Sequence, residues 1–596
     1  MDCIFFVSRS YDNLIGKIWL YTFLHYLRYS IYTMSFNISE LSGRKGLQEN
    51  LFEKLGEAAK ETGSVSIEDS NRLAKEFLIG TANTYGSATF YDFTRPENKG
   101  KKVYICEGSA CMCAGTQSGL KEKLNNHFKE EEIGMMYCLG RCHENHAFNY
   151  QGKNYSGTDI DNIHFLPNHA NEISLSKTDI FSHNSSLLDK YHVAHVGTSV
   201  LTNPFTDIDS YYQLLKESLQ KSPDALLAEL KSSGLRGRGG AGFPTAFKFE
   251  SCKNTPSELK FVVCNADEGD PGAYSDRYLL EQQPHSVLLG MMLAGYMIGA
   301  QHGVLYIRGE YPESIEICEA EIKKLYDKKL LGQHIAGSDF SFDFKVIHAQ
   351  GAYICGEETA LLSSIEGQRP EVRVRPPYPA QVGLFNKPTV VNNVETLACI
   401  PFILREGGER FASIGKGKST GTKLVSLDSF FNRPGIYEVD MGTPLRTVIN
   451  ELGQGFKSDI KAMHIGGPLG GLVPISKIND LEISFESFHE NGFLLGHASV
   501  VCIPQQFPLI NYLHHLFTFT AHESCGKCFP CRLGSTRGAE MLNKALHEDY
   551  KIDKTLLIDL LETMEIGSLC ALGGGLPLPI KNALMYFEEE LRTWIE

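Results

Sequence analysis

The sequence lacks several features that would place it in common functional classes. Basic residues are in the minority, with 57 Lys and Arg against 71 Asp and Glu, and the formal net charge is −14. This balance argues against a nucleic-acid-binding surface. Long hydrophobic runs are also missing. The best candidate for a membrane span, Ile18–Met34, contains His25 and Arg28 and is shorter than the ~20 apolar residues that a span requires. It has no cleavage site of the signal-peptide type either.

Low-complexity tracts and short-period repeats are absent as well. The chain has 596 residues, of which 42% are hydrophobic and 21% are charged. This composition predicts a soluble protein of several globular domains, each able to bury a core.

Cysteine is present, but not in the spacing of a disulfide framework. Eight of the 16 cysteines are scattered, mostly in apolar settings, which favours a reducing cytoplasm. They are Cys3, Cys113, Cys252, Cys264, Cys318, Cys355, Cys399 and Cys502. The other eight fall into two groups with metal-ligand spacing.

The first group is the string CGKCFPC, which contains Cys525, Cys528 and Cys531, together with a distant Cys570 in SLCALGG. Three thiols at Cys-x-x-Cys-x-x-Cys spacing with one separate partner are typical of a [4Fe–4S] cluster. Zinc also binds four thiolates, but usually through two separate Cys-x-x-Cys pairs. A set of inert buried thiols is the third interpretation, and the close spacing argues against it.

The second group combines Cys106 and Cys111 with Cys138 and Cys142. KVYIC and GMMYC each predict a short strand, ending at Cys106 and Cys138 respectively. Ligands that follow two strand ends on glycine-containing loops can converge on one small site. A [2Fe–2S] cluster is the favoured content and zinc is the alternative. Cys113 fits neither pair and is interpreted as a spare thiol.

Changes in composition divide the chain into seven segments. They are an N-terminal extension (1–34) that an incorrectly assigned start codon would explain, a helical bundle (35–98), the first cysteine domain (99–172), a linker (173–199), an α/β domain (200–420), a small α+β module (421–507) and a helical domain with the CGKCFPC string (508–596). In the α/β domain, apolar strands alternate with helical patterns.

The α/β domain opens with a glycine-rich segment, Gly234–Glu250, that carries Arg236, Arg238 and Lys248. Exposed backbone N–H groups before a helix, with added positive charge, suit a phosphate group. The segment matches neither the Rossmann fingerprint nor the Walker loop. A flexible loop without a ligand is the alternative interpretation.

Three further blocks place polar groups after predicted strands. They are Asn265–Gly272, Gly351–Gly367 and Arg375–Thr396. Each alone could be a solvated turn, and an aromatic residue such as Phe243 or Tyr378 is more often part of a core. Together, the four blocks predict a large nucleotide site at the strand ends.

The blocks GLRGRGGAGFPT, NADEGDPGAYSDR, GAYICGEETAL, NKPTVVNNVET and ESCGKCFPCR resemble the NADH-binding flavoprotein subunit of respiratory complex I, the 51 kDa type, over residues 200–596. Residues 45–165 resemble the 24 kDa type subunit with its thioredoxin-like [2Fe–2S] domain. The fusion of the two is similar to the diaphorase subunit of NAD-linked [NiFe] hydrogenases and to the beta subunit of NAD-dependent formate dehydrogenases.

The resemblance implies an α/β multidomain fold. Its parts would be a helical bundle, a thioredoxin-like ferredoxin domain, an α/β FMN/NADH domain, a ubiquitin-like β-grasp domain at 421–507 and a helical iron–sulfur domain. It also implies FMN, NAD(H), a [4Fe–4S] and a [2Fe–2S] cluster. Hydride would pass from NADH to FMN, and single electrons would leave through the [4Fe–4S] cluster, in a reaction that could also run in reverse. The [2Fe–2S] cluster would be a side branch.

The implied partners are other subunits of a complex I, [NiFe] hydrogenase or formate dehydrogenase type of assembly, including an iron–sulfur relay subunit. The implied location is the cytoplasm, where partner subunits could hold the protein at the inner face of the membrane. A non-catalytic, cluster-bearing assembly subunit is the alternative function, and the intact flavin motifs argue against it.

The resemblance also assigns site residues by motif and implies no catalytic side chain beyond bound FMN. The flavin positions are Gly237, Arg238, Gly239, Gly240, Gly242, Lys248, Asn265, Asp267, Glu268, Gly356, Glu357, Asn392, Asn393 and Thr396. The dinucleotide positions are Phe243, Asp270, Glu358, Arg375 and Tyr378, and Tyr353 is a further cofactor-binding position.

The chain departs from the family pattern at several of these positions. Many members have Glu, Lys and Phe where this chain has Asp270, Arg375 and Tyr378. Ser251 replaces an aromatic residue that some members place against the adenine. The interval from Cys111 to Cys138 is short, and no ferredoxin-like cysteine cluster follows Cys570, so another subunit must supply the next electron acceptor.

Overall fold

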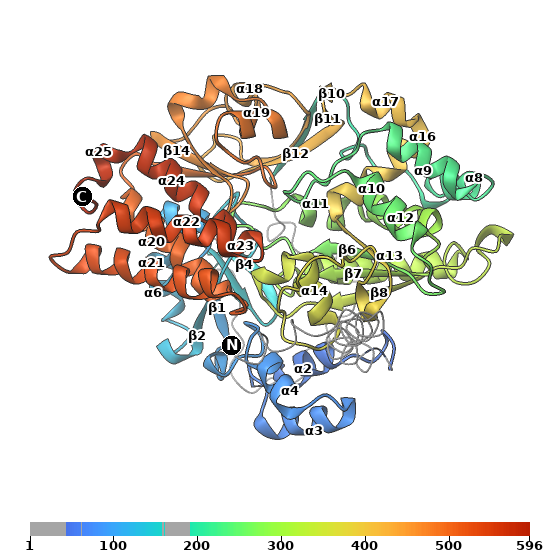
Figure 1. Ribbon diagram of the computed structural model, residues 1–596, viewed down its shortest axis with the longest axis horizontal. Coiled ribbons are helices and arrows are strands. Elements are labelled where there is room, and N and C mark those ends of the chain that lie inside the picture. Colours follow the sequence, from blue (N-terminus) through green and yellow to red (C-terminus); the bar gives the residue numbers. More distant parts are fainter. Residues whose placement is uncertain (1–42, 44, 61, 158–159, 161–190) are drawn as a thin grey trace, which may run out of the picture.

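The computed structural model describes residues 43, 45–60, 62–157, 160 and 191–596 (Figure 1). The expected N-terminal extension, the candidate span Ile18–Met34 and residues 173–190 of the expected linker lie outside these ranges. No helix within them is long and apolar enough to cross a membrane.

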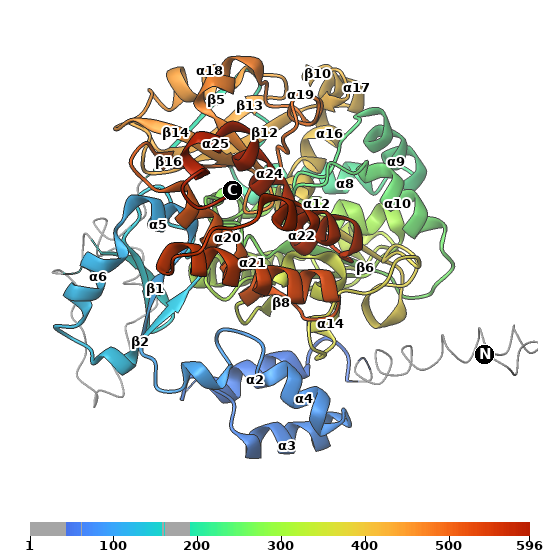
Figure 2. The same ribbon diagram turned by 60° about the vertical axis from the view of Figure 1, so that its left-hand side comes forward.

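The first described domain contains three helices, α2 (Leu51–Ala59), α3 (Ile67–Phe77) and α4 (Thr81–Ala88). Asn50 and Ser66 cap the first two helices by accepting backbone N–H groups, which satisfies donors that a helix start leaves unpaired. Their apolar residues recur at helical spacing and pack together. In Figure 2 this small bundle lies beneath the rest of the molecule.

The second domain is built on a four-stranded sheet in the order β2-β1-β3-β4. Its strands are β1 (Val103–Cys106), β2 (Ile133–Met136), β3 (Ala147–Tyr150) and β4 (Lys153–Ser156), with helices α5 (Ser109–Ala114) and α6 (Gln117–Leu124). β1 and β2 are parallel. The first predicted strand does end at Cys106. The second ends at Met136, two residues before its cysteine, because Cys138 adopts a left-handed turn with φ 45°.

The α/β domain has a parallel sheet in the order β8-β7-β6-β9. Its strands are β6 (Phe261–Ala266), β7 (His302–Ile307), β8 (Asp343–His348) and β9 (Thr389–Asn393). The helices around it include α9 (Pro223–Ser232), α10 (Thr245–Asn254), α11 (Ser275–Gln282), α12 (Pro284–Ile298), α13 (Pro312–Asp327), α14 (Glu358–Ile365) and α15 (Val394–Ala398). Since parallel strands end at the same edge, the polar blocks after β6 and β9 meet there. Helix α9, rather than a strand, precedes the glycine-rich loop, so the loop is not a Rossmann turn.

A six-stranded sheet follows, in the order β15-β14-β16-β12-β13-β5. The strands are β5 (His192–Val196), β12 (Thr422–Leu427), β13 (Gly435–Asp440), β14 (Ile460–Ile465), β15 (Gly471–Pro474) and β16 (Ser499–Pro504). The linker prediction is wrong for His192–Val196, which form an edge strand parallel to β13. An edge strand with mostly exposed side chains lacks the alternation of a half-buried strand, and the sequence pattern therefore missed it.

The C-terminal domain is helical, with α20 (Leu509–Glu523), α21 (Phe529–His547), α22 (Lys554–Gly567), α23 (Ala571–Gly575), α24 (Pro577–Tyr586) and α25 (Glu588–Leu591). These red helices lie side by side in both views (Figures 1 and 2). Helix α20 also contacts the first cysteine domain, through a hydrogen bond between Ser109 Oγ and His515 Nε2 of 3.1 Å.

Candidate functional site

The four cysteines of the CGKCFPC group converge in the C-terminal domain. Cys525 and Cys531 are buried, whereas Cys528 and Cys570 are half-buried. Cys528 and Cys570 stand at the N-termini of α21 and α23, where the helix dipole stabilises negative charge. Burial and the charges of Glu357, Cys531 and Cys525 raise the pKa of the Cys570 thiol to about 12. A metal bound here would stabilise the thiolate form, because metal binding displaces the thiol proton.

The second group of cysteines also converges. The sulfurs of Cys138 and Cys142 lie 3.6 Å apart, and a hydrogen bond from the Cys111 thiol to Cys106, together with burial, raises the pKa of Cys111. The charges of Cys138, Cys111 and Cys106 all contribute to the raised pKa of Cys142. All four side chains are at most 2% exposed, so this site is enclosed.

The enclosed cysteine site adjoins the acidic loop of the α/β domain. The backbone N–H of Gly272 donates to Cys142 Sγ at 3.2 Å. Arg308, at the end of β7, donates to the carbonyl oxygen of Cys138 at 2.8 Å. Neither contact could be predicted from the sequence, because the partners are more than 100 residues apart along the chain.

The glycine-rich loop lies against the end of β9. Gly239 packs on Asn393, since a Cβ built at Gly239 would lie 2.9 Å from the Asn393 Cβ. The backbone N–H of Arg238 donates to Thr396 Oγ1 at 2.8 Å. The Arg238 guanidinium is fully buried and donates to the carbonyl oxygens of Arg236 and Thr420. Its charge therefore supports the loop from within, which differs from the anion contact that the sequence suggested.

Asn265 and Gly356 meet at the edge of the sheet, where Asn265 Nδ2 donates to the Gly356 carbonyl at 2.8 Å. Asp267 is next to them. Burial raises the pKa of its carboxyl well above the usual value, and Asp267 Oδ2 has no hydrogen-bond partner among the described residues. Asn392, at the end of β9, likewise has a buried Nδ2 without a partner in the described part of the chain.

Other acidic residues of the predicted set are engaged within the protein. Glu357 caps α14 by accepting the N–H groups of Thr359 and Ala360. Glu268 accepts the N–H groups that begin α11, from Asp276 at 2.9 Å and Arg277 at 3.1 Å. These two carboxylates therefore hold helix starts at the edge of the site.

Glu358 is the centre of a charged trio. Lys248 Nζ lies 3.0 Å from one of its oxygens, and an Arg375 guanidinium nitrogen lies 3.1 Å from the other. All three side chains are partly exposed. Glu357 Oε1 lies 3.7 Å from the same Arg375 nitrogen, so the two cations are balanced by two carboxylates.

Exposed aromatic rings stand beside this trio. Phe243 and Phe247 are 44% and 63% exposed, and their ring centroids lie 5.7 Å apart in an edge-on arrangement. Tyr378 is 55% exposed. Phe247 was not singled out from the sequence, yet it lies one helical turn before Ser251 on α10, where an aromatic ring is missing. Two exposed rings in contact with each other form a small apolar surface, which can serve a binding role.

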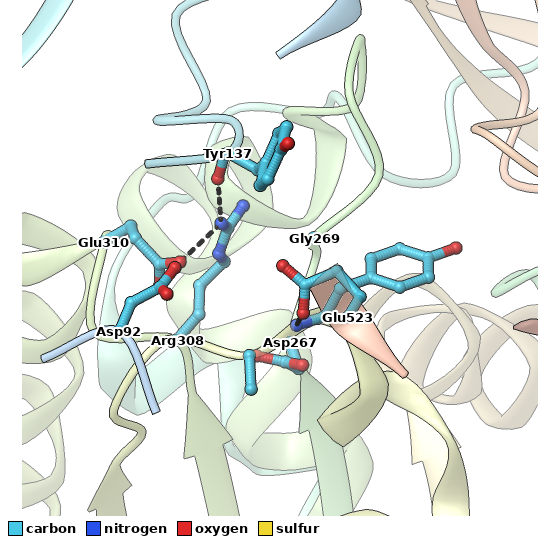
Figure 3. A pocket seen from close by; sticks show the side chains of 9 residues that line it. Asp92, Tyr137, Asp267, Gly269, Arg308, Glu310 and Glu523 are labelled. Atoms are coloured by element: carbon cyan, nitrogen blue, oxygen red, sulfur yellow. Dashed lines mark hydrogen bonds and ion pairs between the residues drawn. The ribbon is translucent and has the colours of Figure 1, made fainter. Parts of the chain in front are cut away.

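A small polar cavity lies where the domains meet (Figure 3). It is lined by Asp92, Tyr137, Asp267, Gly269, Arg308, Glu310, Ala352, Tyr353 and Glu523. Arg308 lies between Glu310 and the Tyr137 carbonyl, and Glu523 accepts the N–H of Tyr353 at 2.8 Å.

Glu523 is a buried acid that the C-terminal domain contributes to this cavity. Burial and the charge of Asp92 raise the pKa of Glu523 to about 7. Tyr353 also donates from its hydroxyl to Asp270 at 2.7 Å, which places both residues at this junction.

Three family matches cover these sites. Residues 230–402 match the Nuo51 FMN-binding domain, residues 511–593 match the NADH-ubiquinone oxidoreductase-F iron-sulfur binding region, and residues 39–165 match the thioredoxin-like [2Fe-2S] ferredoxin. The NADP-reducing hydrogenase subunit HndC of Solidesulfovibrio fructosivorans is 40% identical over 65% of this chain and 81% of that protein. The chain belongs to the Nuo51 flavoprotein family.

Two further relatives of this Nuo51 flavoprotein span more of its length. The NAD-reducing hydrogenase HoxS subunit alpha of Cupriavidus necator is 33% identical over 84% of this chain and 85% of that protein. A chain in the crystal structure of an NAD+-reducing [NiFe]-hydrogenase in the H2-reduced state has a TM-score of 0.78 and 26% identity, with 92% of each chain covered. The expected α/β multidomain fold, the fusion with a [2Fe–2S] domain and the FMN, [4Fe–4S] and [2Fe–2S] cofactors are thereby confirmed.

The residues of this Nuo51 flavoprotein fit such cofactors on structural grounds. Each group of four thiols is gathered in one place, as a cluster requires. At the edge of the sheet, Asp267 Oδ2 and Asn392 Nδ2 are an acceptor and a donor that remain buried and unpaired in the described residues. Buried polar atoms are nearly always paired, so a ligand with both donors and acceptors, such as a flavin ring, suits this edge.

Proposed function

We propose that this diaphorase-type subunit binds FMN at the carboxyl edge of β6 and β9 and NADH beside it, and passes electrons to a partner subunit through the [4Fe–4S] site. Bound FMN would accept a hydride from NADH and release electrons singly. The observation that carries the proposal is that the loops of the proposed flavin site are in contact with the cysteine-bearing segments. The acidic loop that follows β6 is hydrogen-bonded to Cys142, and the glycine-rich loop packs on Asn393 at the end of the neighbouring strand β9. On the other side, Glu523, two residues before Cys525, accepts the N–H of Tyr353 at 2.8 Å.

The chain's own residues would divide the work between them. The glycine-rich loop presents backbone N–H groups to phosphate, and Asn265, Asp267 and Asn392 orient the ring system. Phe243, Phe247 and Tyr378 provide aromatic surfaces for the dinucleotide, since planar bases stack on such rings.

The partner is proposed to dock beside Cys528 and Cys570. Phe529, Leu533, Ile566 and Leu569 are 65%, 57%, 85% and 40% exposed. Gly567 packs against Pro530, since a Cβ built there would lie 2.7 Å from the proline ring, so the two segments form one apolar patch. A contiguous exposed patch of this kind marks an interaction surface. An iron–sulfur relay subunit of a hydrogenase, formate dehydrogenase or complex I type assembly would bind to this patch.

The location is proposed to be the cytoplasm. The described cysteines are free thiols, which fits a reducing compartment.

The function is tested by the absorption spectrum of the purified full-length protein with and without NADH. We expect flavin bands that bleach on addition of NADH. A protein that carries iron but neither holds flavin nor bleaches would support the alternative of a non-catalytic assembly subunit.

The choice of dinucleotide is tested at Glu358. A carboxylate near the adenine-side ribose accepts hydrogen bonds from the ribose hydroxyls and repels a 2′-phosphate. We therefore expect NADH to be preferred over NADPH. Lys248 and Arg375 offset this repulsion, so the preference should be modest, and the relative HndC is named as NADP-reducing. Glu358→Gln should narrow the ratio of kcat/KM values for NADH and NADPH by about threefold to tenfold, equivalent to about 1 kcal/mol. Glu371→Gln, at a partly exposed carboxylate that lies 4.0 Å from Lys527, is the matched control. An unchanged ratio in Glu358→Gln would remove Glu358 from this role.

A further inference from the structure

His497 is a buried histidine that no motif of the sequence singled out. It lies in the turn before β16 and is 5% exposed. The turn is tight because Gly496 and Ala498, on either side, have φ angles of 55° and 63°. Gly496 also approaches the glycine-rich loop, since a Cβ built at Gly240 would lie 4.0 Å from the Gly496 backbone. The imidazole is therefore held directly behind the proposed flavin site.

Two buried carboxylates face this ring. His497 Nε2 lies 3.5 Å from Asp276 Oδ2 and 3.7 Å from Glu268 Oε1. Glu268 and Asp276 are 4% and 2% exposed. At these distances neither ring nitrogen of His497 forms a hydrogen bond within the described residues. The contact is thus an ion pair in a desolvated setting, where opposite charges interact most strongly.

The cations near the ring are paired with other carboxylates, so they do not replace His497 as the counter-ion of Glu268 and Asp276. Lys423 is paired with the fully buried Glu395, and Asp270, which is hydrogen-bonded to Tyr353, adds negative charge. Arg277 pairs with Glu281 at 3.0 Å and Arg308 with Glu310 at 2.8 Å.

The two carboxylates are connected to the flavin-site loops. Asp276 Oδ2 accepts the side-chain amide of Asn393 at 2.6 Å. Asn393 Oδ1 accepts the N–H of Glu395 at 3.0 Å, and Gly239 packs on the Asn393 side chain. Glu268 begins α11. A change in the charge of either carboxylate would therefore be transmitted to the glycine-rich loop.

We propose that His497 is a positioning residue of the flavin site, which as an imidazolium compensates the buried negative charge of Glu268 and Asp276 and thereby fixes Asn393 beneath the glycine-rich loop. This inference rests on the proposed FMN site. Removal of one member of a buried charge group leaves the others uncompensated. Without the imidazolium, two carboxylates would face each other in a buried space, and one of them would have to take up a proton.

The titration of His497 and Glu268 predicts the direction in which FMN binding changes with pH. Asp276 and Glu268 raise the pKa of His497 to about 9 against the effect of burial, and burial together with Asp276 raises the pKa of Glu268 to about 7. A histidine with a raised folded-state pKa stabilises most below its unfolded value of ~6.5 and loses that contribution as the pH rises through the folded value. FMN retention in the wild type should therefore hold to pH 8.5 or so and fall as the pH passes through about 9.

The decisive experiment measures FMN affinity of the full-length protein, by flavin fluorescence, from pH 6 to 10. His497→Gln should bind FMN at pH 6, where the two carboxylates share a proton, and at least about tenfold more weakly at pH 8, because a buried charge is then uncompensated. His497→Lys should restore binding at pH 8. His464→Gln is the matched control, because it removes a buried imidazole whose pKa burial lowers to about 4, and it should follow the wild type.

Each other outcome overturns the inference. A pH profile of His497→Gln that matches the wild type would show that the charge does not position the site. The ligand atoms of Glu268, Asp276 and His497 lie within 4.8 Å of one another. One equivalent of a divalent metal in the wild type, beyond the cluster iron and lost in His497→Gln, would therefore make the triad a metal site instead. If His497→Gln does not fold, the wild-type profile and His497→Lys decide, since the fall through pH 9 must move upward in the lysine variant. Failure of the wild type to bind FMN at any pH would instead refute the proposed function.

Discussion

The two cysteine sites of this flavoprotein have the same number of ligands and opposite surroundings. At the C-terminal site, Cys528 and Cys570 are half-buried beside the exposed side chains of Phe529 and Ile566. At the N-terminal site all four thiols are at most 2% exposed, and the loop of Cys142 is hydrogen-bonded to the α/β domain. Under the proposed function, the first site would exchange electrons with another protein, and the second would exchange them within the chain.

The difference also concerns how each site is stabilised. The enclosed site is tied to the flavin domain through Gly272 and Arg308, so its geometry depends on the packing of two domains. At the C-terminal site, Cys528 and Cys570 stand at helix N-termini, whose dipoles favour anionic ligands, while the buried Cys525 and Cys531 pack in the core of the α/β domain. Mutations that separate local from interdomain effects will therefore show whether the comparison holds.

The largest effect is expected at the exposed site. Cys528→Ser replaces a soft thiolate with a hard hydroxyl, so the [4Fe–4S] signal should disappear. Electron delivery to the partner should fall to background while NADH still reduces the flavin. Stopped-flow absorbance and EPR measure the two steps. Ser524→Ala, which removes a hydroxyl 3.4 Å from Cys531 Sγ and leaves all four thiols, is the control. Normal delivery by Cys528→Ser would end the assignment of this site as the exit.

A smaller effect is expected at the patch beside the exposed site. Ile566→Glu places a charge on the proposed docking surface, so the Kd for an iron–sulfur partner should rise by about tenfold, equivalent to about 1.4 kcal/mol. The cluster spectrum should not change. Ile67→Glu, on α3 and 71% exposed in the wild type, is the matched control and should bind normally. Equal effects of the two substitutions on binding would show that the patch is not the docking surface.

The sequence was sufficient for the features encoded by local spacing. The cysteines that the spacing grouped do lie together in the structure, and the strands before the acidic loops follow from their continuous apolar runs. The roles of the nucleotide-site residues remain predictions. Contacts between distant segments could not be predicted, because a hydrogen bond such as Gly272 N–H to Cys142 Sγ leaves no periodic signal. The same reason explains why the buried Arg238 was assigned to an anion and why His497 was missed.

The smallest effect is expected at the enclosed site, where the choice of cysteine matters. Cys106 contacts Cys111 within its own domain, whereas Cys142 also accepts the N–H of Gly272. Cys106→Ser should therefore abolish the [2Fe–2S] EPR signal and leave NADH:ferricyanide activity within about twofold, because a side-branch cluster is off the main path and serine is a poor iron ligand. Cys142→Ser should additionally weaken FMN retention, since the serine oxygen is smaller than sulfur and lies further from Gly272. Cys113→Ser, which alters a buried thiol outside both ligand groups, is the control. Iron analysis of the full-length protein decides the [2Fe–2S] assignment, because zinc in place of iron at this site would refute it. A loss of ferricyanide activity in Cys106→Ser would place the enclosed cluster on the main path of electron transfer. That result would remove the contrast between the two sites.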